Sequence, residues 1–364
     1  MIEIDGVKIG QEHSPYVIAE LSANHGGSID AAKESLRLAK ESGASAVKIQ
    51  SYTPDTMTIE SKKADFLITE GLWEGYTLYD LYKEAYTPFE WHEELFRHAK
   101  EIGITLFSSP FDETAVELLQ DLNAPAYKIA SFELVDLPLI KRAAECGKPL
   151  LMSTGMASVS EVKEALDTAL RYGNGEVLLF HCISSYPASL RDSNLKNIEF
   201  LREEFGVEVG LSDHTLTNIA STISIGMGAS AVEKHFKPSD AAVGPDASFS
   251  ITPNQLKNLV TDCNDAWSSL GKGGFQRSKS EEGSLKHRRS LYFMKDLKKG
   301  SVINPCDIRA IRPGNGISPK FADAIIGKTL IIDVERGDPV LSDVFFDSMS
   351  EWYDSQKKPN SEFC

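Results

Sequence analysis

The sequence predicts an α/β fold: a (β/α)8 TIM barrel followed by a small β-rich domain. Eight short apolar segments alternate along the chain with segments of helical periodicity. The apolar segments are hydrophobic almost throughout, which is typical of parallel strands buried on both faces. Eight such units within about 260 residues match the length of a closed barrel. The alternative, an open doubly wound sheet, usually has fewer strands and often a glycine-rich turn after the first, which is absent here.

The expected elements follow from this alternation. We expect strands at residues 16–20, 46–50, 105–109, 126–130, 149–154, 177–182, 208–213 and 231–236. The helices between them include 29–42, 88–103, 112–122, 159–172 and 217–226. Gly43, Gly103 and Gly173 stand where three of these helices should end, and glycine favours the left-handed conformation that closes a helix.

Composition divides the chain into parts. We expect a catalytic barrel domain over 1–275, opening with a β-hairpin at 1–15, and then a polar, exposed linker at 276–289. Short strands and glycine turns predict a small β-rich domain at 290–346. A domain of this size is marginal alone and usually needs a docking partner. The polar residues 347–364 are expected to form a flexible tail.

Composition also excludes several classes of protein. The chain has 38 Lys and Arg residues and 53 Asp and Glu residues, which gives a net charge of −15. Such a charge would repel the phosphate backbone of a nucleic acid, so no nucleic acid partner is expected. No apolar run suits a membrane span, the mean hydropathy is −0.22, and no secretory signal is recognised. Five scattered cysteines without a Cys-x-x-Cys motif argue against disulfides or a thiolate metal site, and for a reducing cytoplasm.

Polar side chains stand at the carboxyl ends of all eight expected strands. TIM-barrel active sites lie at the carboxyl ends of the strands, where such residues meet. Because successive residues alternate between the faces of a strand, residues two apart share a face; three such pairs are Lys48 and Gln50, Ser212 and His214, and Glu233 and His235. The full set is Glu20, Lys48, Gln50, Ser108, Ser109, Lys128, Ser131, Ser153, Thr154, His181, Ser184, Ser212, Asp213, His214, Glu233 and His235.

Two of these residues indicate a metal. His214 and His235 end adjacent strands and are spaced to meet across the strand pair. Either histidine alone is more often a hydrogen-bonded structural residue. Together, beside Glu233 and Asp213, they indicate a divalent metal ion, and the oxygen-rich surroundings favour Mn²⁺ or Mg²⁺. Two protein ligands leave positions open for substrate and water, as a Lewis acid requires.

The lysines indicate an anion site. Lysine is almost never buried unpaired, so Lys48 and Lys128 on apolar strands point to function. Two ammonium groups with several hydroxyls around one barrel mouth suit a phosphate and carboxylate cradle; the hydroxyls are those of Ser109, Ser131, Ser153 and Ser212. A Schiff-base lysine, as in barrel aldolases, is the rival interpretation.

In their local sequence these residues closely resemble the sialic acid synthase family. The matching words are Ile18-Ala19-Glu20, Asn24-His25-Gly26-Gly27, Val47-Lys48-Ile49-Gln50, Ser108-Ser109-Pro110-Phe111, Ala126 to Ser131, Ser153-Thr154-Gly155-Met156, His181-Cys182, Tyr186-Pro187, Gly210 to Thr215, Glu233-Lys234-His235-Phe236, Gly244-Pro245-Asp246 and Arg312 to Gly316. The match runs from about residue 15 to residue 346. Its C-terminal part resembles the SAF, or antifreeze-like, domain that these enzymes carry.

The resemblance implies condensation of phosphoenolpyruvate (PEP) with an N-acetylated amino sugar to give a nonulosonic acid and phosphate. It assigns PEP binding to Lys48, Ser109, Lys128, Ser131, Ser153, Ser184 and Ser212, and the metal to His214 and His235. Glu20 would position the water, and Gln50, Tyr186 and Asp246 would line the sugar site. One position departs from the family, which has Asn where this chain has Ser184, so a phosphate contact there would be weaker.

The resemblance also implies an assembly and a branch. Arg312, from the SAF domain of a neighbouring subunit, would contact the N-acyl group of the sugar, which implies a domain-swapped homodimer. Residues 76–88 resemble the pseudaminic acid synthases, whose sugar is 2,4-diacetamido-2,4,6-trideoxy-L-altrose, although an amphipathic helix with a tyrosine core stripe fits them as well. N-acetylneuraminate or legionaminate synthesis is the alternative within the family.

Two functions outside the family stay open. A barrel aldolase would use Lys128 as an imine nucleophile. A carbohydrate-binding module on a barrel scaffold would need no catalytic groups, and the ionisable barrel mouth argues against it.

Overall fold

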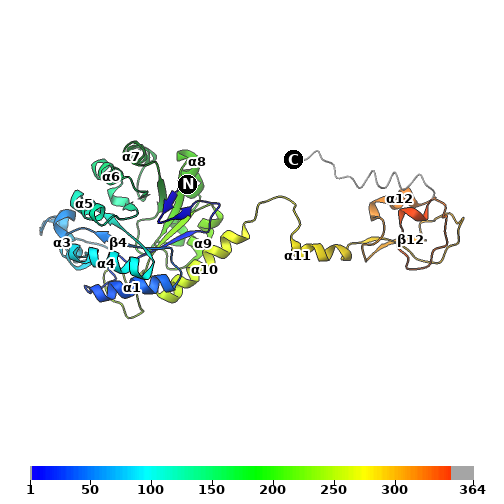
Figure 1. Ribbon diagram of the computed structural model, residues 1–364, viewed down its shortest axis with the longest axis horizontal. Helices are drawn as coiled ribbons and strands as arrows, with labels where there is room; N and C mark the ends of the chain where they lie inside the picture. Colours follow the sequence, from blue (N-terminus) through cyan, green and yellow to red (C-terminus); the bar gives the residue numbers. More distant parts are fainter. Residues whose placement is uncertain (1, 346–364) are drawn as a thin grey trace. The chain divides into compact units, whose positions relative to one another are not determined.

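The computed structural model describes residues 2–345, and the chain divides into two compact units after Gly271 (Figure 1). The first unit is a closed barrel of eight parallel strands. Around the barrel the strands are β3 (Tyr16–Glu20), β4 (Ala46–Ser51), β5 (Thr105–Pro110), β6 (Tyr127–Ile129), β7 (Leu150–Ser153), β8 (Val177–Cys182), β9 (Glu208–Asp213) and β10 (Ala231–His235). The predicted TIM barrel is therefore confirmed, and all eight strands form where the sequence places them.

Helices surround the strands, as Figure 1 shows. They are α1 (Ile29–Glu41), α4 (Phe89–Ile102), α5 (Glu113–Asp121), α6 (Leu137–Ala144), α7 (Val159–Tyr172), α8 (Asn197–Phe205), α9 (Ile219–Gly226) and α10 (Pro253–Ser269). Apolar side chains of the helices pack on the outer faces of the strands, in one cluster around Leu36, Leu95 and Leu256 and another around Leu119, Ile140 and Val162. Burial on both faces explains why the strand segments are apolar almost throughout.

The amino end of the barrel is sealed by a short hairpin. Strands β1 (Ile2–Ile4) and β2 (Val7–Ile9) pair antiparallel. Ile2, Ile4 and Ile9 are buried in one cluster with Phe107 and Phe180 inside the barrel. The barrel interior is thus a packed core at this end.

Two of the three glycines expected to end helices adopt the left-handed conformation. Gly103 has φ 71° and Gly43 has φ 88°. Helix α7 does end before Gly173, but the left-handed conformation expected there is wrong, because the φ of −103° and ψ of −166° are extended. Glycine is needed there for space instead, since a Cβ atom would lie 2.8 Å from the carbonyl oxygen of Ala169.

The second unit has a small core of its own. Strands β11 (Ser290–Phe293) and β12 (Ile308–Ile311) pair antiparallel, and α12 (Ala322–Ile325) follows. Leu291, Phe293, Ile317 and Val340 are among its buried residues. The stretch expected to be a linker holds two exposed turns of helix, α11 (Lys279–Glu282) and η4 (Gly283–His287). The expected tail at 347–364 lies outside the described residues.

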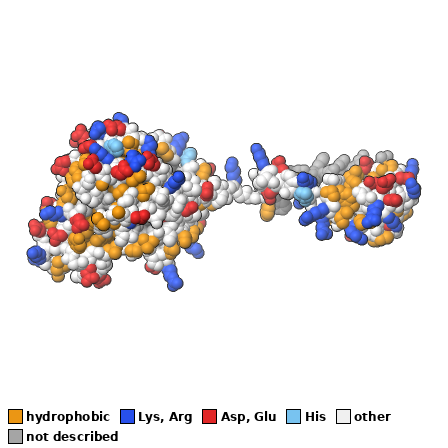
Figure 2. Space-filling model, turned by 90° about the horizontal axis from the view of Figure 1, so that it is seen from below, with side chains coloured by type: hydrophobic (Ala, Val, Ile, Leu, Met, Phe, Trp, Pro, Cys, Tyr) orange, Lys and Arg blue, Asp and Glu red, His pale blue; other side chains and the backbone are white. Residues whose placement is uncertain are grey.

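The surface of the first unit mixes charges of both signs. On the face drawn in Figure 2, Lys and Arg side chains are interspersed with Asp and Glu among apolar side chains. Within residues 2–345, the helices are all too short or too polar to cross a bilayer.

Replacing Gly210 with Ala should destabilise the barrel. A Cβ atom at this position of β9 would lie 2.7 Å from Cε1 of Phe180 and 2.8 Å from the carbonyl oxygen of Ala231. Such overpacking costs about 1–3 kcal/mol of unfolding free energy, which a denaturant titration followed by circular dichroism measures. Gly226→Ala in α9 is the control, because a Cβ there meets no atom within 4 Å. Equal stability of the two variants would contradict this packing.

Candidate active site

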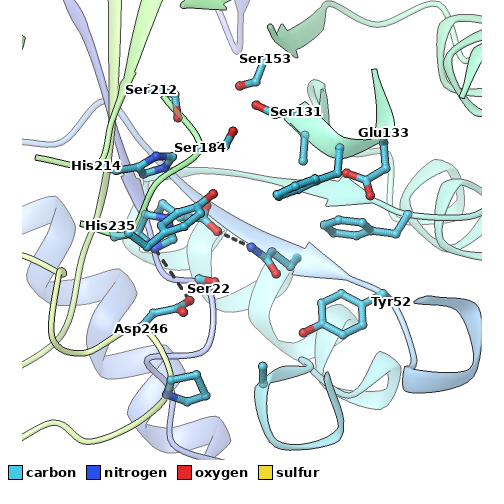
Figure 3. A pocket seen from close by; sticks show the side chains of 18 of the residues that line it. Ser22, Tyr52, Ser131, Glu133, Ser153, Ser184, Ser212, His214, His235 and Asp246 are labelled. Carbon is cyan, nitrogen blue, oxygen red and sulfur yellow. Dashed lines mark hydrogen bonds and ion pairs between the residues drawn. The ribbon is translucent and has the colours of Figure 1, made fainter. Parts of the chain in front are cut away.

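A cavity of about 400 Å³ opens at the carboxyl ends of the barrel strands (Figure 3). The structure brings most of the predicted site residues together around it: Glu20, Lys48, Gln50, Lys128, Ser131, Ser153, Ser184, Tyr186, Ser212, His214, His235 and Asp246. Ser109 lies behind this lining, where its hydroxyl accepts a hydrogen bond from Nζ of Lys48 at 3.2 Å. Arg312 belongs to the second unit and directly follows β12.

A buried network of four charges forms the floor of the cavity. Nζ of Lys48 lies 3.1 Å from Oε2 of Glu20 and 3.3 Å from Oε1 of Glu233. Nζ of Lys128 donates to both carboxylate oxygens of Glu233, at 3.1 and 3.2 Å. All four side chains are almost completely buried, so each charge depends on its partners to offset the loss of water.

The two carboxylates differ in how readily they bind a proton. Burial raises the pKa of Glu20 to about 7, and the attraction of Lys48 offsets only part of that rise. Burial also disfavours the charge of Glu233, but Lys128 and Lys48 outweigh it and lower the pKa of Glu233 to about 2. Glu233 is therefore a permanent anion between the lysines, whereas Glu20 can gain or lose a proton near neutral pH.

The two histidines meet as predicted. The ring centroids of His214 and His235 are 5.3 Å apart. Nδ1 of His214 donates to the carbonyl oxygen of Ile183 at 2.9 Å, which fixes the orientation of the ring. His235 is buried, its Nδ1 has no hydrogen-bond partner and lies 3.8 Å from Oδ2 of Asp246, and burial together with the charge of His214 holds the pKa of His235 well below its usual range.

Four strand-end residues do not line the cavity. Asp213, which we expected beside the histidines, is turned toward the helices, where it pairs with Nζ of Lys234 at 2.7 Å. The hydroxyl of Ser108 bonds to that of Ser51, the hydroxyl of Thr154 donates to the carbonyl oxygen of Phe180, and Nε2 of His181 donates to the carbonyl oxygen of Ser193. Strand alternation explains Asp213, Thr154 and His181, since each is adjacent in sequence to a residue that lines the cavity.

The cavity includes functional groups that the sequence analysis missed. Ser22 has a φ of 45° and hydrogen-bonds Asp246. Glu133 points in from the turn after β6, with Oε2 buried and unpartnered, and burial raises its pKa to about 7. No strand pattern in the sequence indicates Glu133, because β6 ends at Ile129 and Glu133 lies in a 3-10 turn over Ser131–Glu133.

A glycine shapes the serine-rich corner of the cavity. The amide of Gly155 donates to Oγ of Ser131 at 3.2 Å. A Cβ atom on Gly155 would lie 2.4 Å from Oγ of Ser184 and 2.8 Å from Oγ of Ser131. The absence of a side chain therefore keeps both hydroxyls free to face the cavity.

The Glu133→Gln variant should become more stable relative to the wild type as the pH rises. The pKa of Glu133 is raised from 4.5 to about 7 in the fold, so the stability associated with its protonated form is complete below pH 4.5 and declines as the pH passes 7. The glutamine variant avoids that decline. We expect its unfolding free energy to gain about 1–2 kcal/mol over the wild type between pH 4.5 and pH 8, with the exposed Glu117→Gln as control. A difference independent of pH would contradict the burial of this carboxyl.

Comparison with known proteins confirms the resemblance. Residues 35–274 match the NeuB family, and residues 288–343 match the SAF domain. The chain is 41% identical over 333 residues to pseudaminic acid synthase of Helicobacter pylori, which covers 90% of this chain and 97% of that one. It is 38% identical over 346 residues to N,N'-diacetyllegionaminic acid synthase of Legionella pneumophila, covering 93% and 97%. A crystal structure of N-acetylneuraminic acid synthetase from Leptospira borgpetersenii matches with a TM-score of 0.70 at 28% identity, covering 78% and 94%. The chain belongs to the NeuB family, with a SAF domain after its barrel.

Proposed function

We propose that this chain is a pseudaminic acid synthase. It condenses PEP with 2,4-diacetamido-2,4,6-trideoxy-L-altrose and water, and releases pseudaminic acid and phosphate. The observation that carries the proposal is the buried network of Lys48, Lys128, Glu20 and Glu233 beside two imidazoles in one cavity. Support for the branch comes from the pseudaminic acid synthases, at 41% identity over about nine-tenths of the chain.

In this proposal the lysines and serines hold PEP, namely Lys48, Ser109, Lys128, Ser131, Ser153, Ser184 and Ser212. Nζ of Lys48 already contacts Glu20, Glu233 and Ser109, whereas Nζ of Lys128 hydrogen-bonds Glu233 and lies 4.8 Å from the centre of the Phe180 ring. PEP therefore takes over lysine contacts that Glu233 holds in the free enzyme. Oγ of Ser153 is buried without a partner, which supports a ligand contact there. The pairing of Lys128 with both oxygens of Glu233 favours a charged anion-binding lysine over an imine nucleophile.

Glu20 is the proposed base. Its pKa of about 7 suits a group that accepts a proton from water near neutral pH. The amide of Gln50 donates to Oε1 of Glu20 at 3.2 Å, which orients the carboxylate toward the cavity. We propose that the water activated here adds to C2 of PEP after C3 has bonded to the sugar, so that the tetrahedral centre expels phosphate by C–O cleavage. Gln50, Tyr186 and Asp246 position the sugar.

A divalent metal ion, Mn²⁺ or Mg²⁺, is part of the proposal, with His214 and His235 as its protein ligands. The hydrogen bond from His214 to the Ile183 carbonyl is the kind of contact that orients metal-binding imidazoles. His235 is a neutral ring with an unpartnered Nδ1. Within residues 2–345 no three His, Cys, Asp or Glu side chains gather as a metal site, so the proposal gives the ion two protein ligands. A bound ion would supply a Lewis acid for the aldehyde oxygen of the sugar.

His235→Ala should abolish sugar-dependent release of phosphate from PEP, with a loss of about 100-fold or more. Calorimetric titration with Mn²⁺ gives a second measurement, in which the variant should bind the ion more weakly. His98→Ala, on α4 outside the cavity, is the control. Unchanged turnover and unchanged Mn²⁺ affinity would remove the metal assignment.

A phosphate-release panel tests the branch. With PEP and Mn²⁺, we expect the highest kcat/KM for 2,4-diacetamido-2,4,6-trideoxy-L-altrose among acetamido sugars that include N-acetylmannosamine and the legionaminate precursor. A preference for either of the other sugars assigns the chain to the alternative branch. Borohydride trapping of a pyruvate adduct on Lys128, without phosphate release, would instead indicate an aldolase.

A domain-swapped homodimer is the proposed assembly, in which Arg312 of one subunit serves the barrel of the other. The support is that a small SAF unit usually needs a partner to dock on. Action in a reducing cytoplasm is proposed because the four cysteines within residues 2–345 are free thiols.

Mixing two inactive variants tests the swap. Lys48→Met removes a barrel group, and Arg312→Ala removes the SAF group. After subunit exchange the mixture should regain about a quarter of the wild-type rate, because half of the dimers are mixed and each mixed dimer has one intact site. No recovery, or a monomer at all concentrations in sedimentation, would contradict the swap.

A further inference from the structure

The cavity has an apolar side that the proposed chemistry does not use. Part of it is lined by side chains of the long connection between β4 and α4, which includes α2 (Pro54–Met57) and α3 (Leu78–Ala85). We call Met57, Ile68, Trp73, Leu78 and Tyr82 the apolar wall. The ring of Tyr82 lies 5.9 Å from that of Tyr52, which Figure 3 shows across the cavity from His214 and His235.

The apolar wall is held by contacts of its own. The amide of Ile68 donates to the carbonyl oxygen of Tyr76 at 2.9 Å, and that of Gly75 donates back to Ile68 at 2.9 Å, so this part of the connection is a small hairpin. Nε1 of Trp73 donates to the carbonyl oxygen of Pro245 at 3.0 Å. The only hydrogen-bond donor of the tryptophan side chain is therefore already bonded to the protein, and the ring presents an apolar surface to the cavity.

The position of the apolar wall ties it to the sugar. The ring of Trp73 lies 5.8 Å from that of Tyr186, and Pro245 directly precedes Asp246. Tyr186 and Asp246 are the residues proposed to position the sugar, and they line the same cavity as the apolar wall. A sugar in contact with Tyr186 and Asp246 would therefore lie beside Trp73, with the apolar wall within reach of its non-reacting end.

The chemistry of the apolar wall restricts what that end can be. Met57, Ile68 and Leu78 carry no hydrogen-bonding group, so a sugar hydroxyl placed against them would lose its water without replacement. Methyl groups gain by the same burial. An apolar surface of this kind discriminates against an added hydroxyl by about 100-fold.

We propose that the apolar wall determines acceptor specificity, by taking up the deoxygenated C6 methyl group and the acyl methyl of the sugar and disfavouring acceptors with hydroxyls at those positions. This inference rests on the proposed function and adds to it the residues that distinguish a trideoxy, di-N-acylated sugar from N-acetylmannosamine. None of these residues belongs to the buried charge network, so the apolar wall sets which acceptor reacts and leaves PEP binding alone.

Polar substitutions in the apolar wall test the proposal. Ile68→Asn and Leu78→Gln should each lower kcat/KM for 2,4-diacetamido-2,4,6-trideoxy-L-altrose by about 10–100-fold, while kcat/KM for N-acetylmannosamine stays the same or rises. The KM for PEP should not change, which also shows that the variants fold. Met57→Gln, with an unbranched side chain of similar length, is the further variant if either of the first two is unstable.

Matched controls lie on the same connection. Ile59 is 61% exposed and Leu72 is 49% exposed, and neither lines the cavity. Ile59→Asn and Leu72→Gln should leave the ratio of the two sugars unchanged. If the apolar-wall variants lose both sugars equally, or neither, the inference is overturned while the proposed function stands. If the wild-type chain releases no phosphate with any acetamido sugar, the proposed function fails and the inference fails with it.

Discussion

The need to neutralise charge inside the barrel governs the site. Two ammonium groups and two carboxylates are buried at the carboxyl ends of β3, β4, β6 and β10, and each would be costly alone. Glu233 bridges both lysines and favours the charged form of each, although burial still lowers the pKa of Lys128. The network is balanced before any ligand arrives. An incoming anion therefore meets preorganised donors and replaces existing contacts, which is how an electrostatic site limits reorganisation during a reaction.

The fold could be predicted well because one physical pattern repeats. Each barrel strand is buried on both faces, and this leaves a continuous apolar run that sequence shows directly. The same regularity placed Lys48, Ser212 and His235 in the cavity. The prediction failed for Asp213, which was placed in the site only because it ends a strand. Side chains alternate along the strand, and that of Asp213 points toward Lys234 and the helices. Gly173 is a second case in which sequence position was not enough. A glycine is needed there because the carbonyl oxygen of Ala169 leaves no space for a side chain, and the backbone is not left-handed.

The part of the site that sequence did not reveal lies on irregular segments. Glu133 sits on a turn, and the apolar wall comes from a connection built of a small hairpin and the short helices α2 and α3. Its apolar residues resemble the core residues of an amphipathic helix, so their exposure to a cavity becomes evident only in three dimensions. Segments of this kind carry specificity on a scaffold that supplies the common chemistry.

The isoleucine plug at the amino end of the barrel has a consequence for how a bound ligand is exposed. Ile2, Ile4 and Ile9 fill that end, and the cavity is lined by residues at the carboxyl ends of the strands. A ligand that took the place of Glu233 at Lys48 and Lys128 would therefore have packed protein on one side, and would meet a second reactant or bulk water on the other.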